Sequence, residues 1–347
     1  GSDLIGDYQH LDTYTVSSTS YGGSTSLYPS RLHNPYFSWE KTTKLEVALE
    51  LGFLGDRVQV HTAWYRNRSG NQLVGIPLPG TTGFSSIQAN LPATVENKGL
   101  ELELNTTPVS GRKFRWNSNF NISFPENKLV EFPGLEGSTY ANKYVVGYPT
   151  SIVKVYNYEG IDPETGHYVI TDYNNDGAIT SPDDNQVIEE VGINFFGGWS
   201  NQLTYKQWEF SFLFQFVDQR QKNYNALLAN PGVMFNQPVE LLDVWSEENP
   251  DGRYMPYTTG AHPSIYQLLG YFRGSTATIG DASFIRLKNI QLGYRLPVRG
   301  YLQDVRFYVQ GQNLLTITDY FGLDPEFVLT GYLPPLKTWA FGIQMNF

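Results

Sequence analysis

Strict alternation of apolar and polar residues is the dominant pattern of this chain. Over residues 208–216, for example, every second residue is aromatic. Runs with the same period occupy residues 44–53, 57–64, 100–104, 114–124 and 339–347. Successive side chains of a strand point to opposite faces, whereas helical spacing would scatter each set around a cylinder. The pattern therefore predicts a chain made of about ten to twelve β-strands.

The links between these runs indicate what the apolar face contacts. In a soluble sandwich it would pack on a second sheet, and in a membrane barrel it would face lipid while polar residues line a wet lumen. Short links (52–57, 105–112, 205–208, 297–304) alternate with long ones (about 66–92, 125–196, 217–281, 318–336). Short periplasmic turns and long outer loops are typical of up-and-down barrels. We therefore predict an all-β, antiparallel, up-and-down transmembrane β-barrel with long extracellular loops.

Composition narrows the function classes. Aromatic residues make up 15% of the 347 residues, which favours strands, and the formal net charge of −10 argues against a nucleic-acid surface. No apolar run approaches the ~18 residues of a transmembrane helix. The chain has no cysteine, which excludes disulfides and thiolate metal sites.

Catalytic patterns are missing from the sequence. There is no Gly-x-Ser-x-Gly elbow, no glycine-rich phosphate loop and no His-Glu-x-x-His motif. Adjacent acid pairs such as Asp183-Asp184 and Glu247-Glu248 are not the spaced, facing carboxylates of glycoside hydrolysis. The chain is therefore predicted not to be an enzyme.

Several short segments, in order and spacing, resemble one protein family. They are Trp39-Glu40-Lys41-Thr42-Thr43 after Asn34-Pro35, Val95-Glu96-Asn97-Lys98-Gly99-Leu100-Glu101, Phe120-Asn121-Ile122-Ser123, Gly147-Tyr148-Pro149, Asp172-Tyr173-Asn174-Asn175-Asp176-Gly177, Arg286-Leu287-Lys288-Asn289-Ile290-Gln291-Leu292-Gly293-Tyr294 and Gly311-Gln312-Asn313-Leu314. Over essentially its full length the chain resembles the C-terminal half of SusC/RagA-type TonB-dependent transporters of Bacteroidetes.

This resemblance implies an outer-membrane location and a barrel of about 22 strands, of which residues 1–347 would be the C-terminal part. The plug domain and the TonB box would lie outside this chain, which opens at Gly1 without an initiator Met and is interpreted as a fragment or a processed chain. The implied partners are a SusD-like surface lipoprotein acting as a lid, TonB with ExbB and ExbD, the N-terminal plug and half-barrel, and membrane lipid. A dimer of transporter–lid pairs is a further expectation. The substrate class would be oligosaccharides or peptides.

One loop resembles a calcium-binding loop. Asp172, Asn174 and Asp176 alternate ahead of Gly177, Ala178 would offer its carbonyl, and Asp183 stands at the twelfth place. An EF-hand has a bidentate Glu at that place, and the shorter Asp puts the affinity in doubt. Calcium is the possible cofactor, and its role would be to stiffen a long loop. Alternatively, these residues only make turns.

Aromatic residues of the longest connection are the candidates for contact with substrate or lid. Trp245, Tyr254, Tyr257 and Tyr266 are foremost, and Tyr224, Phe235 and Tyr271 lie in the same connection. Packing within the loop is the alternative for each of them. At the chain end, Gly342, Met345 and Phe347 resemble an outer-membrane barrel-assembly signal, although Ala340 stands where a polar residue is usual.

The sequence therefore predicts TonB-dependent import of a bulky nutrient through a polar barrel lumen. The alternative is a soluble, secreted β-sandwich that binds or hydrolyses glycans. The two differ in what covers the apolar rows: hydrocarbon in the first, a second sheet in the second.

Overall fold

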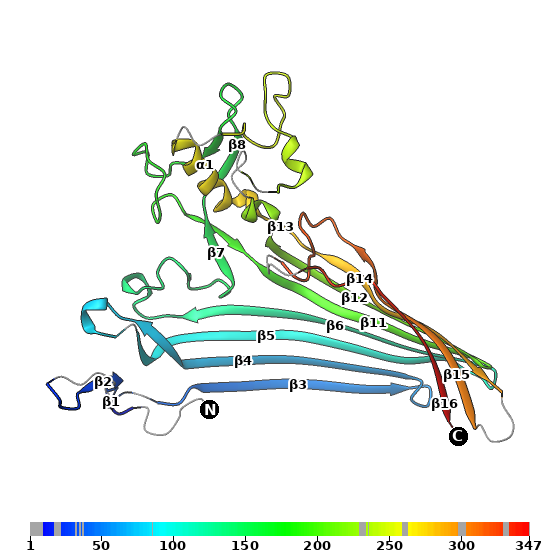
Figure 1. Cartoon of the computed structure of the whole chain (residues 1–347). Helices are drawn as coiled ribbons and strands as arrows, with labels where there is room; N and C mark the ends of the chain where they lie inside the picture. The colour runs from blue at the N-terminus through cyan, green and yellow to red at the C-terminus, as the bar shows by residue number, and fades with distance from the viewer. Residues whose placement is uncertain are drawn as a thin grey trace. The chain divides into compact units, whose positions relative to one another are not determined.

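A computed structural model describes residues 10–16, 22–31, 33–34, 36, 38–84, 86–228, 234, 236–258, 263–297, 303–328 and 333–346. Its main element is one antiparallel sheet in the order β16-β15-β14-β12-β11-β6-β5-β4-β3, with β13 paired beside β12 (Figure 1). Neighbours in this order are also neighbours in sequence among the long strands, which is the up-and-down connectivity that the link lengths predict.

The strands of this sheet are long. They are β3 (Lys41–Phe53), β4 (Val58–Pro77), β5 (Ser86–Ser110), β6 (Phe114–Glu131), β11 (Gly192–Tyr205), β12 (Trp208–Lys222), β13 (Ile279–Asp281), β14 (Phe284–Leu296), β15 (Asp304–Ile317) and β16 (Thr338–Asn346). A tilted strand needs about 9–11 residues to cross a bilayer. β16 has 9 residues, and every other strand of the sheet except β13 is longer than this, with β4, β5 and β6 the longest at 20, 25 and 18 residues.

Short elements occupy the connections. They are β1 (Thr13–Val16) paired with β2 (Leu27–Arg31), β7 (Ile152–Val155) with β10 (Val187–Glu190), β8 (Tyr158–Ile161) with β9 (Tyr168–Ile170), the helix α1 (Pro263–Arg273), and the single turns η1 (Gly80–Thr82), η2 (Leu135–Gly137), η3 (Tyr224–Leu227), η4 (Val239–Leu242) and η5 (Thr276–Thr278). Among the described residues, none of the helices has the length and apolar character needed to cross a membrane.

The predicted long link at about residues 66–92 was wrong. Most of it is strand, because β4 continues to Pro77 and β5 begins at Ser86. Polar residues occupy both faces here: Asn67 and Ser69 on one, Arg66 and Arg68 on the other. A strand that is wet on both faces has no apolar period, so alternation could not reveal it.

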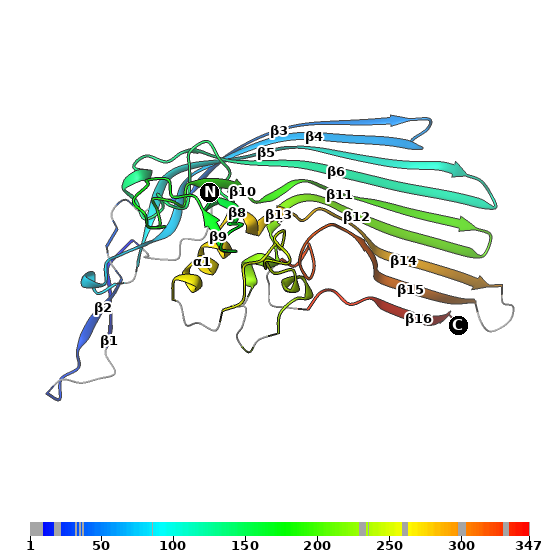
Figure 2. The ribbon, with the colours of Figure 1, turned by 90° about the horizontal axis from the view of Figure 1, so that it is seen from above.

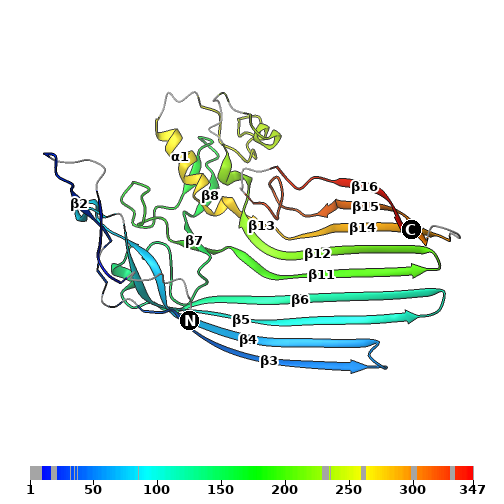
Figure 3. The same ribbon diagram turned by 60° about the horizontal axis from the view of Figure 1, so that its bottom comes forward.

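The long strands of the sheet run side by side (Figure 3), and their cross-strand register sorts the side chains into rows of opposite character. One apolar row crosses six strands in the order Trp116, Leu203, Phe210, Leu292, Val309, Phe341. The adjacent row, on the other face, is Asn117, Gln202, Ser211, Gln291, Gln310, Ala340. We call these two sides the apolar face and the polar face of the sheet.

The apolar face is uncovered. Leu45 is 47% exposed, Leu102 36% and Phe341 78%. In the described part of the chain no second sheet packs on these rows, since the remaining sheets are two-stranded pairs in the connections. This arrangement contradicts the β-sandwich alternative and fits the barrel.

The chain divides into two compact units. The first comprises Gly1–Val47, Trp64–Gly99 and Glu126–Thr150, and the second Ala48–Ala63, Leu100–Pro125 and Ser151–Phe347. The first unit has a small core of Ala93, Leu129 and Phe132, with Tyr140 and Tyr144 packed against it.

The second unit contains a larger core. It lies in two of the unit's long connections, residues 151–191 and 223–283, which we call the loop body (Figure 2). The members of this core are Tyr168, Leu228, Leu241, Tyr254, Met255, Leu269 and Phe272. The long connections of the second unit are therefore folded structure with their own hydrophobic interior.

Candidate functional site

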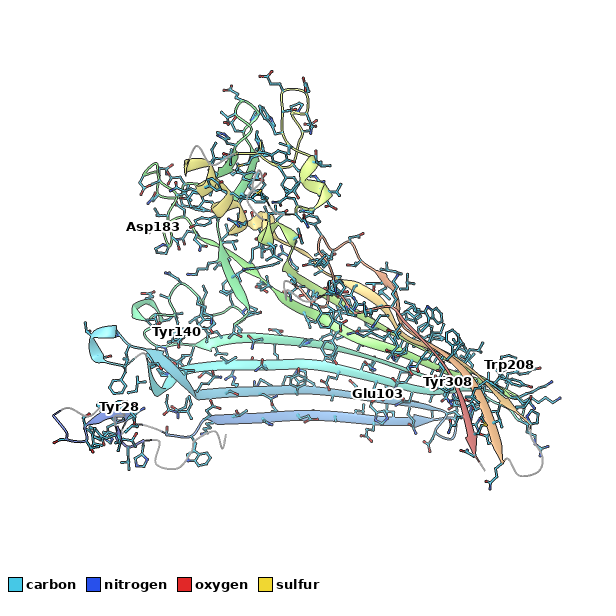
Figure 4. All side chains as sticks on the ribbon, in the orientation of Figure 1. Tyr28, Glu103, Tyr140, Asp183, Trp208 and Tyr308 are labelled. Atoms are coloured by element: carbon cyan, nitrogen blue, oxygen red, sulfur yellow. The ribbon has the colours of Figure 1, made fainter. Side chains whose placement is uncertain are left out.

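The polar face of the second unit carries a network of amide and hydroxyl side chains. The Glu103 Oε1 atom accepts hydrogen bonds from Asn105 Nδ2 at 2.8 Å and Asn119 Nδ2 at 3.0 Å. Thr107 donates to Asn117 Oδ1 at 3.2 Å. These residues come from β5 and β6, where every second position points to this face, and Figure 4 labels Glu103 on β5.

A hollow of about 350 Å³ opens beside this network. Its lining is polar throughout: Asp56, Arg57, Gln59, Asn105, Thr106, Thr107, Asn117, Ser118, Asn119, Ser200 and Gln202. Arg57 closes one side, since its guanidinium donates to the carbonyl oxygens of Thr107 and Pro108. Such a wall offers many hydrogen bonds of both polarities to a hydrated molecule, and its two charged side chains are Asp56 and Arg57.

A charged cluster lies at the turn ends of β12, β14 and β15. Glu209 accepts from Arg295 Nε at 2.7 Å and from Arg306 Nε at 3.0 Å, and Arg306 also stacks on the ring of Tyr308 at 5.5 Å. Gly342 makes room for that ring, because a Cβ at this glycine would lie 2.3 Å from Tyr308 Cζ. Figure 4 places Trp208 and Tyr308 at this same end of the strands. The glycine of the predicted assembly signal therefore has a packing role.

The loop body is held together by stacked aromatic rings. Phe272 lies parallel to Tyr168, with centroids 4.1 Å apart, and Tyr158 meets Phe272 edge to face at 5.2 Å. Burial raises the pKa of Tyr158 to about 12, with a smaller contribution from Tyr254. Burial also raises the pKa of Tyr168 above its ordinary value. These phenols stay neutral at any physiological pH and serve as core residues.

The structure places the four predicted contact aromatics in different surroundings. Tyr254 is 3% exposed, and its hydroxyl donates to Asn225 Oδ1 at 3.1 Å. Trp245 lies over Gly166, whose Cβ would fall 2.3 Å from the indole. Tyr266 is half-buried on α1, and Tyr257 is 52% exposed with its hydroxyl donating to the Leu241 carbonyl oxygen at 2.6 Å. Of the four, Tyr257 offers the most accessible ring, and contact with substrate or lid stays a prediction for all of them.

A second hollow, of about 480 Å³, lies in the loop body. Tyr158, Tyr254 and Phe272 line it together with Asn225, Asp251 and Arg253. The hydrogen bond from Arg253 to Asp243 holds the pKa of the Asp243 carboxyl below its usual range. Sequence reasoning missed this hollow, because its residues come from segments far apart in the chain.

The predicted calcium loop is closed by its own backbone. Asp172 accepts from the amides of Asn175 at 2.7 Å and Gly177 at 2.8 Å, and Asp176 accepts from Ala178 at 2.8 Å. Asp184, which is 0% exposed, accepts from the amides of Tyr173 and Thr180. Asp183, the preceding residue, is exposed and is labelled in Figure 4.

The residues of this loop therefore act at least as turn formers. In the part of the chain that the structure describes, no group of three or more His, Asp or Glu side chains is arranged to hold a metal ion. Calcium at Asp172, Asn174, Asp176, Ala178 and Asp183 stays a prediction.

Replacing Asp172 with alanine should loosen this loop. The backbone amides of Asn175 and Gly177 then lose their acceptor. Leaving a buried donor unpaired destabilises the folded loop by about 1–3 kcal/mol, and the loss is smaller where water takes the place of the carboxylate. Faster amide exchange at residues 173–180 would show it, with Glu164→Ala in a separate turn as the control. Repeating the wild-type measurement with calcium and with a chelator tests the metal: equal exchange in both would contradict the calcium prediction.

A buried ion cluster fastens another loop to the polar face. Arg286 of β14 is 1% exposed and donates to Asp324 Oδ2 and Glu326 Oε2, both at 2.6 Å. Lys288 adds a contact to Glu326 at 2.8 Å, and Gln219 of β12 donates to the Pro325 carbonyl oxygen at 2.8 Å. Sequence reasoning missed this cluster. An arginine inside a strand, followed by two carboxylates in the next long link, was the available signal.

The predicted assembly signal is described only in part. Gly342 and Met345 lie in β16, where Met345 continues the apolar row of Phe341 and Ile343, and Phe347 lies outside the described residues. Its role in assembly stays a prediction.

Comparisons with known proteins identify the type of barrel. No family model matches the chain. TonB-dependent receptor P26 of Formosa agariphila is 29% identical over 94% of this chain and 35% of its own length, and receptor P3 of the same organism is 27% identical over 90% and 35%. TonB-dependent receptor SusC of Bacteroides thetaiotaomicron is 24% identical over the whole chain and 36% of its own length. The chain thus spans about a third of the length of these relatives.

Solved structures give the same result. The RagAB peptide transporter superposes with a TM-score of 0.80 at 25% identity, covering 100% of this chain and 40% of that chain. RagAB in its 'closed-closed' state gives 0.76 at 26% identity, covering 99% and 39%. The names are those of receptors and transporters, which confirms the prediction that the chain is not an enzyme. TonB-dependent receptors are outer-membrane proteins, so the predicted location is confirmed as well. The up-and-down sheet, its bare apolar face and these likenesses together show that the chain has the fold of part of a transmembrane β-barrel similar to those of SusC/RagA-type TonB-dependent receptors.

Proposed function

We propose that the chain forms part of the wall of an importer that moves a bulky, hydrated nutrient across the outer membrane. The observation that carries the proposal is the polar row Asn117–Gln202–Ser211–Gln291–Gln310, which crosses five strands without an apolar interruption. In a barrel whose apolar face meets lipid, this row lines the lumen. Neutral amides and hydroxyls suit an oligosaccharide or a peptide, since both present many donors and acceptors.

The energy source and the partners follow from the family likeness. TonB with ExbB and ExbD would drive import through the plug of the complete protein. A SusD-like lipoprotein would cover the loop body, and two transporter–lid pairs would assemble as a dimer. The similar RagAB complex is named a peptide importer with 'open-open' and 'closed-closed' states, which supports a lid that opens and closes.

Uptake by the native host tests the proposal. Deleting the complete gene should abolish growth on one class of nutrient, and supplying purified oligosaccharides and peptides separately identifies that class. The variant Asn117→Leu/Gln202→Leu/Gln291→Leu makes the row apolar, and we expect it to slow uptake by about tenfold or more, because unpaired polar groups of the substrate lose about 1–3 kcal/mol each.

The matched control lies on the opposite face. Leu203→Val and Leu292→Val change residues that contact lipid, and uptake should stay near wild type. Copurification of the complete protein under mild detergent should recover a lipoprotein in equal amount. Normal growth of the deletion strain on every oligosaccharide and peptide supplied would disprove import of these nutrients as the function.

A further inference from the structure

The apolar face of the first unit ends in cationic side chains. On β3 the exposed residues Leu45 and Val47 share a face with Lys41, and on β4 Trp64 shares a face with Arg66 and Arg68. Each of these cations lies about 9–13 residues from the short turn that joins β3 to β4, the length at which a strand leaves the hydrocarbon. The cations therefore stand where lipid headgroups begin.

Strands β5 and β6 carry charged residues next to these cations. Lys98 of β5 donates to Glu126 of β6 at 2.9 Å, and Glu96 accepts from Arg68. The core of the first unit shows on which side of β5 and β6 these charged residues lie. Ala93 of β5 and Leu129 of β6 are core residues, and each is an odd number of residues from the charged residues of its own strand. The charged residues therefore point to the side opposite the core. Lys128 follows Glu126 on the same face and is exposed. We call this set the cationic rim: Lys41, Arg66, Arg68, Lys98 and Lys128, with Glu96 and Glu126.

The rim holds more cations than its carboxylates neutralise. Lys41 and Lys128 form no ion pair with the described residues, and the side chains of Arg66 and Arg68 remain 42% and 48% exposed. Arg68 uses its Nε for Glu96, so its terminal nitrogens stay accessible. This excess of positive charge occurs on a chain whose formal net charge is −10.

Protein stability gives little reason for the rim. Arg68 has a structural role as the partner of the buried Glu96, but the Lys98–Glu126 pair is exposed and therefore adds little, and uncompensated cations repel one another. The apolar row of β12, by contrast, continues into Asp218 and Arg220, and Arg220 is paired with Glu189 at 2.9 Å. In the described part of the chain, the excess of cations over carboxylates at this boundary is therefore largest on β3 to β6, and a recognition role explains it.

We propose that the cationic rim binds the phosphate-bearing headgroup of an outer-leaflet lipid, whose acyl chains lie against Leu45, Val47 and Trp64. Arginine presents a planar fork of donors that matches phosphate, and lysine adds point charges around it. Basic residues beside a lipid-facing surface attract anionic headgroups. The proposal concerns the outside of the barrel and is independent of what the lumen transports.

Lipid retention by the complete protein tests the site. The protein is extracted from outer membranes in mild detergent, and phosphate-bearing lipid bound per protein is counted by native mass spectrometry. In the variant Lys41→Gln/Lys98→Gln/Lys128→Gln we expect occupancy to fall by about tenfold or more, because three headgroup contacts are lost. Raising the salt concentration should lower wild-type occupancy in the same direction.

Two further variants separate binding from folding. Arg66→Gln/Arg68→Gln/Glu96→Gln removes the two arginines of the rim and should also lose lipid. Glu96 is changed with them because its buried carboxylate would otherwise be left without a cation. Arg112→Gln/Lys113→Gln removes cations from the turn at the opposite end of β5 and β6 and should retain wild-type occupancy. Equal lipid in both rim variants and the wild type would overturn the proposal. So would binding of inorganic phosphate as tight as that of the lipid, since the acyl chains would then contribute nothing.

Discussion

Replacing Arg286 with methionine is expected to release residues 318–328 from the polar face of the barrel wall. The methionine keeps most of the side-chain volume but leaves Asp324, which has a side chain only 10% exposed, without its cation. Breaking a buried ion pair on one side costs about 3–5 kcal/mol, because the remaining charge is neither paired nor hydrated. Amide exchange of residues 318–328 in the complete protein measures this local opening.

Two matched variants identify the cause. Lys288→Met removes a cation that is 26% exposed and shares Glu326 with Arg286, so it should cost less than about 1 kcal/mol. Arg286→Met/Asp324→Asn removes the stranded charge as well and should recover part of the loss. If Arg286→Met and Lys288→Met open the segment equally, burial of the cluster is not what holds it.

The membrane-crossing parts of the fold could be predicted from sequence because each strand has one face in hydrocarbon and one in water. Residues 208–216 show this directly, since Phe210, Phe212 and Phe214 all lie on the apolar face of β12. Beyond the hydrocarbon that constraint ends. The outer parts of β4 and β5 are therefore strands that the alternation did not reveal.

The candidate site was less accessible to sequence reasoning. The core of the loop body joins Tyr168, Leu241 and Phe272 from three separate segments, and no periodic pattern links them. In the calcium-like loop, spacing pointed to Asp183, whereas the fully buried carboxylate that binds backbone amides is Asp184. Adjacent identical residues can be told apart only by which of them the fold turns inward.

Truncating Phe272 to alanine is expected to unfold the loop body while the barrel strands remain paired. The ring is 2% exposed and packs in parallel on Tyr168 at 4.1 Å. Loss of a buried Phe costs about 3–5 kcal/mol, and stacked aromatic pairs add about 0.5–1.5 kcal/mol beyond burial. That sum is comparable to the whole stability of a small core. Hydrogen exchange should accelerate throughout residues 151–191 and 223–283, with β12 and β14 unchanged.

We expect Phe272→Ala to act through the loss of ring packing in the core and not through a change in the stability of the helix α1. Phe272→Leu keeps much of the apolar volume and should lose less than half as much, and Gln267→Ala on the exposed side of α1 should stay within about 0.5 kcal/mol of wild type. Because the lid is proposed to sit on the loop body, Phe272→Ala should also reduce copurification of the lipoprotein while the protein still reaches the outer membrane. Equal acceleration in β12 and β14 would contradict a loop body that folds around its own core, and the barrel and its outer loops would then have to be treated as one cooperative structure.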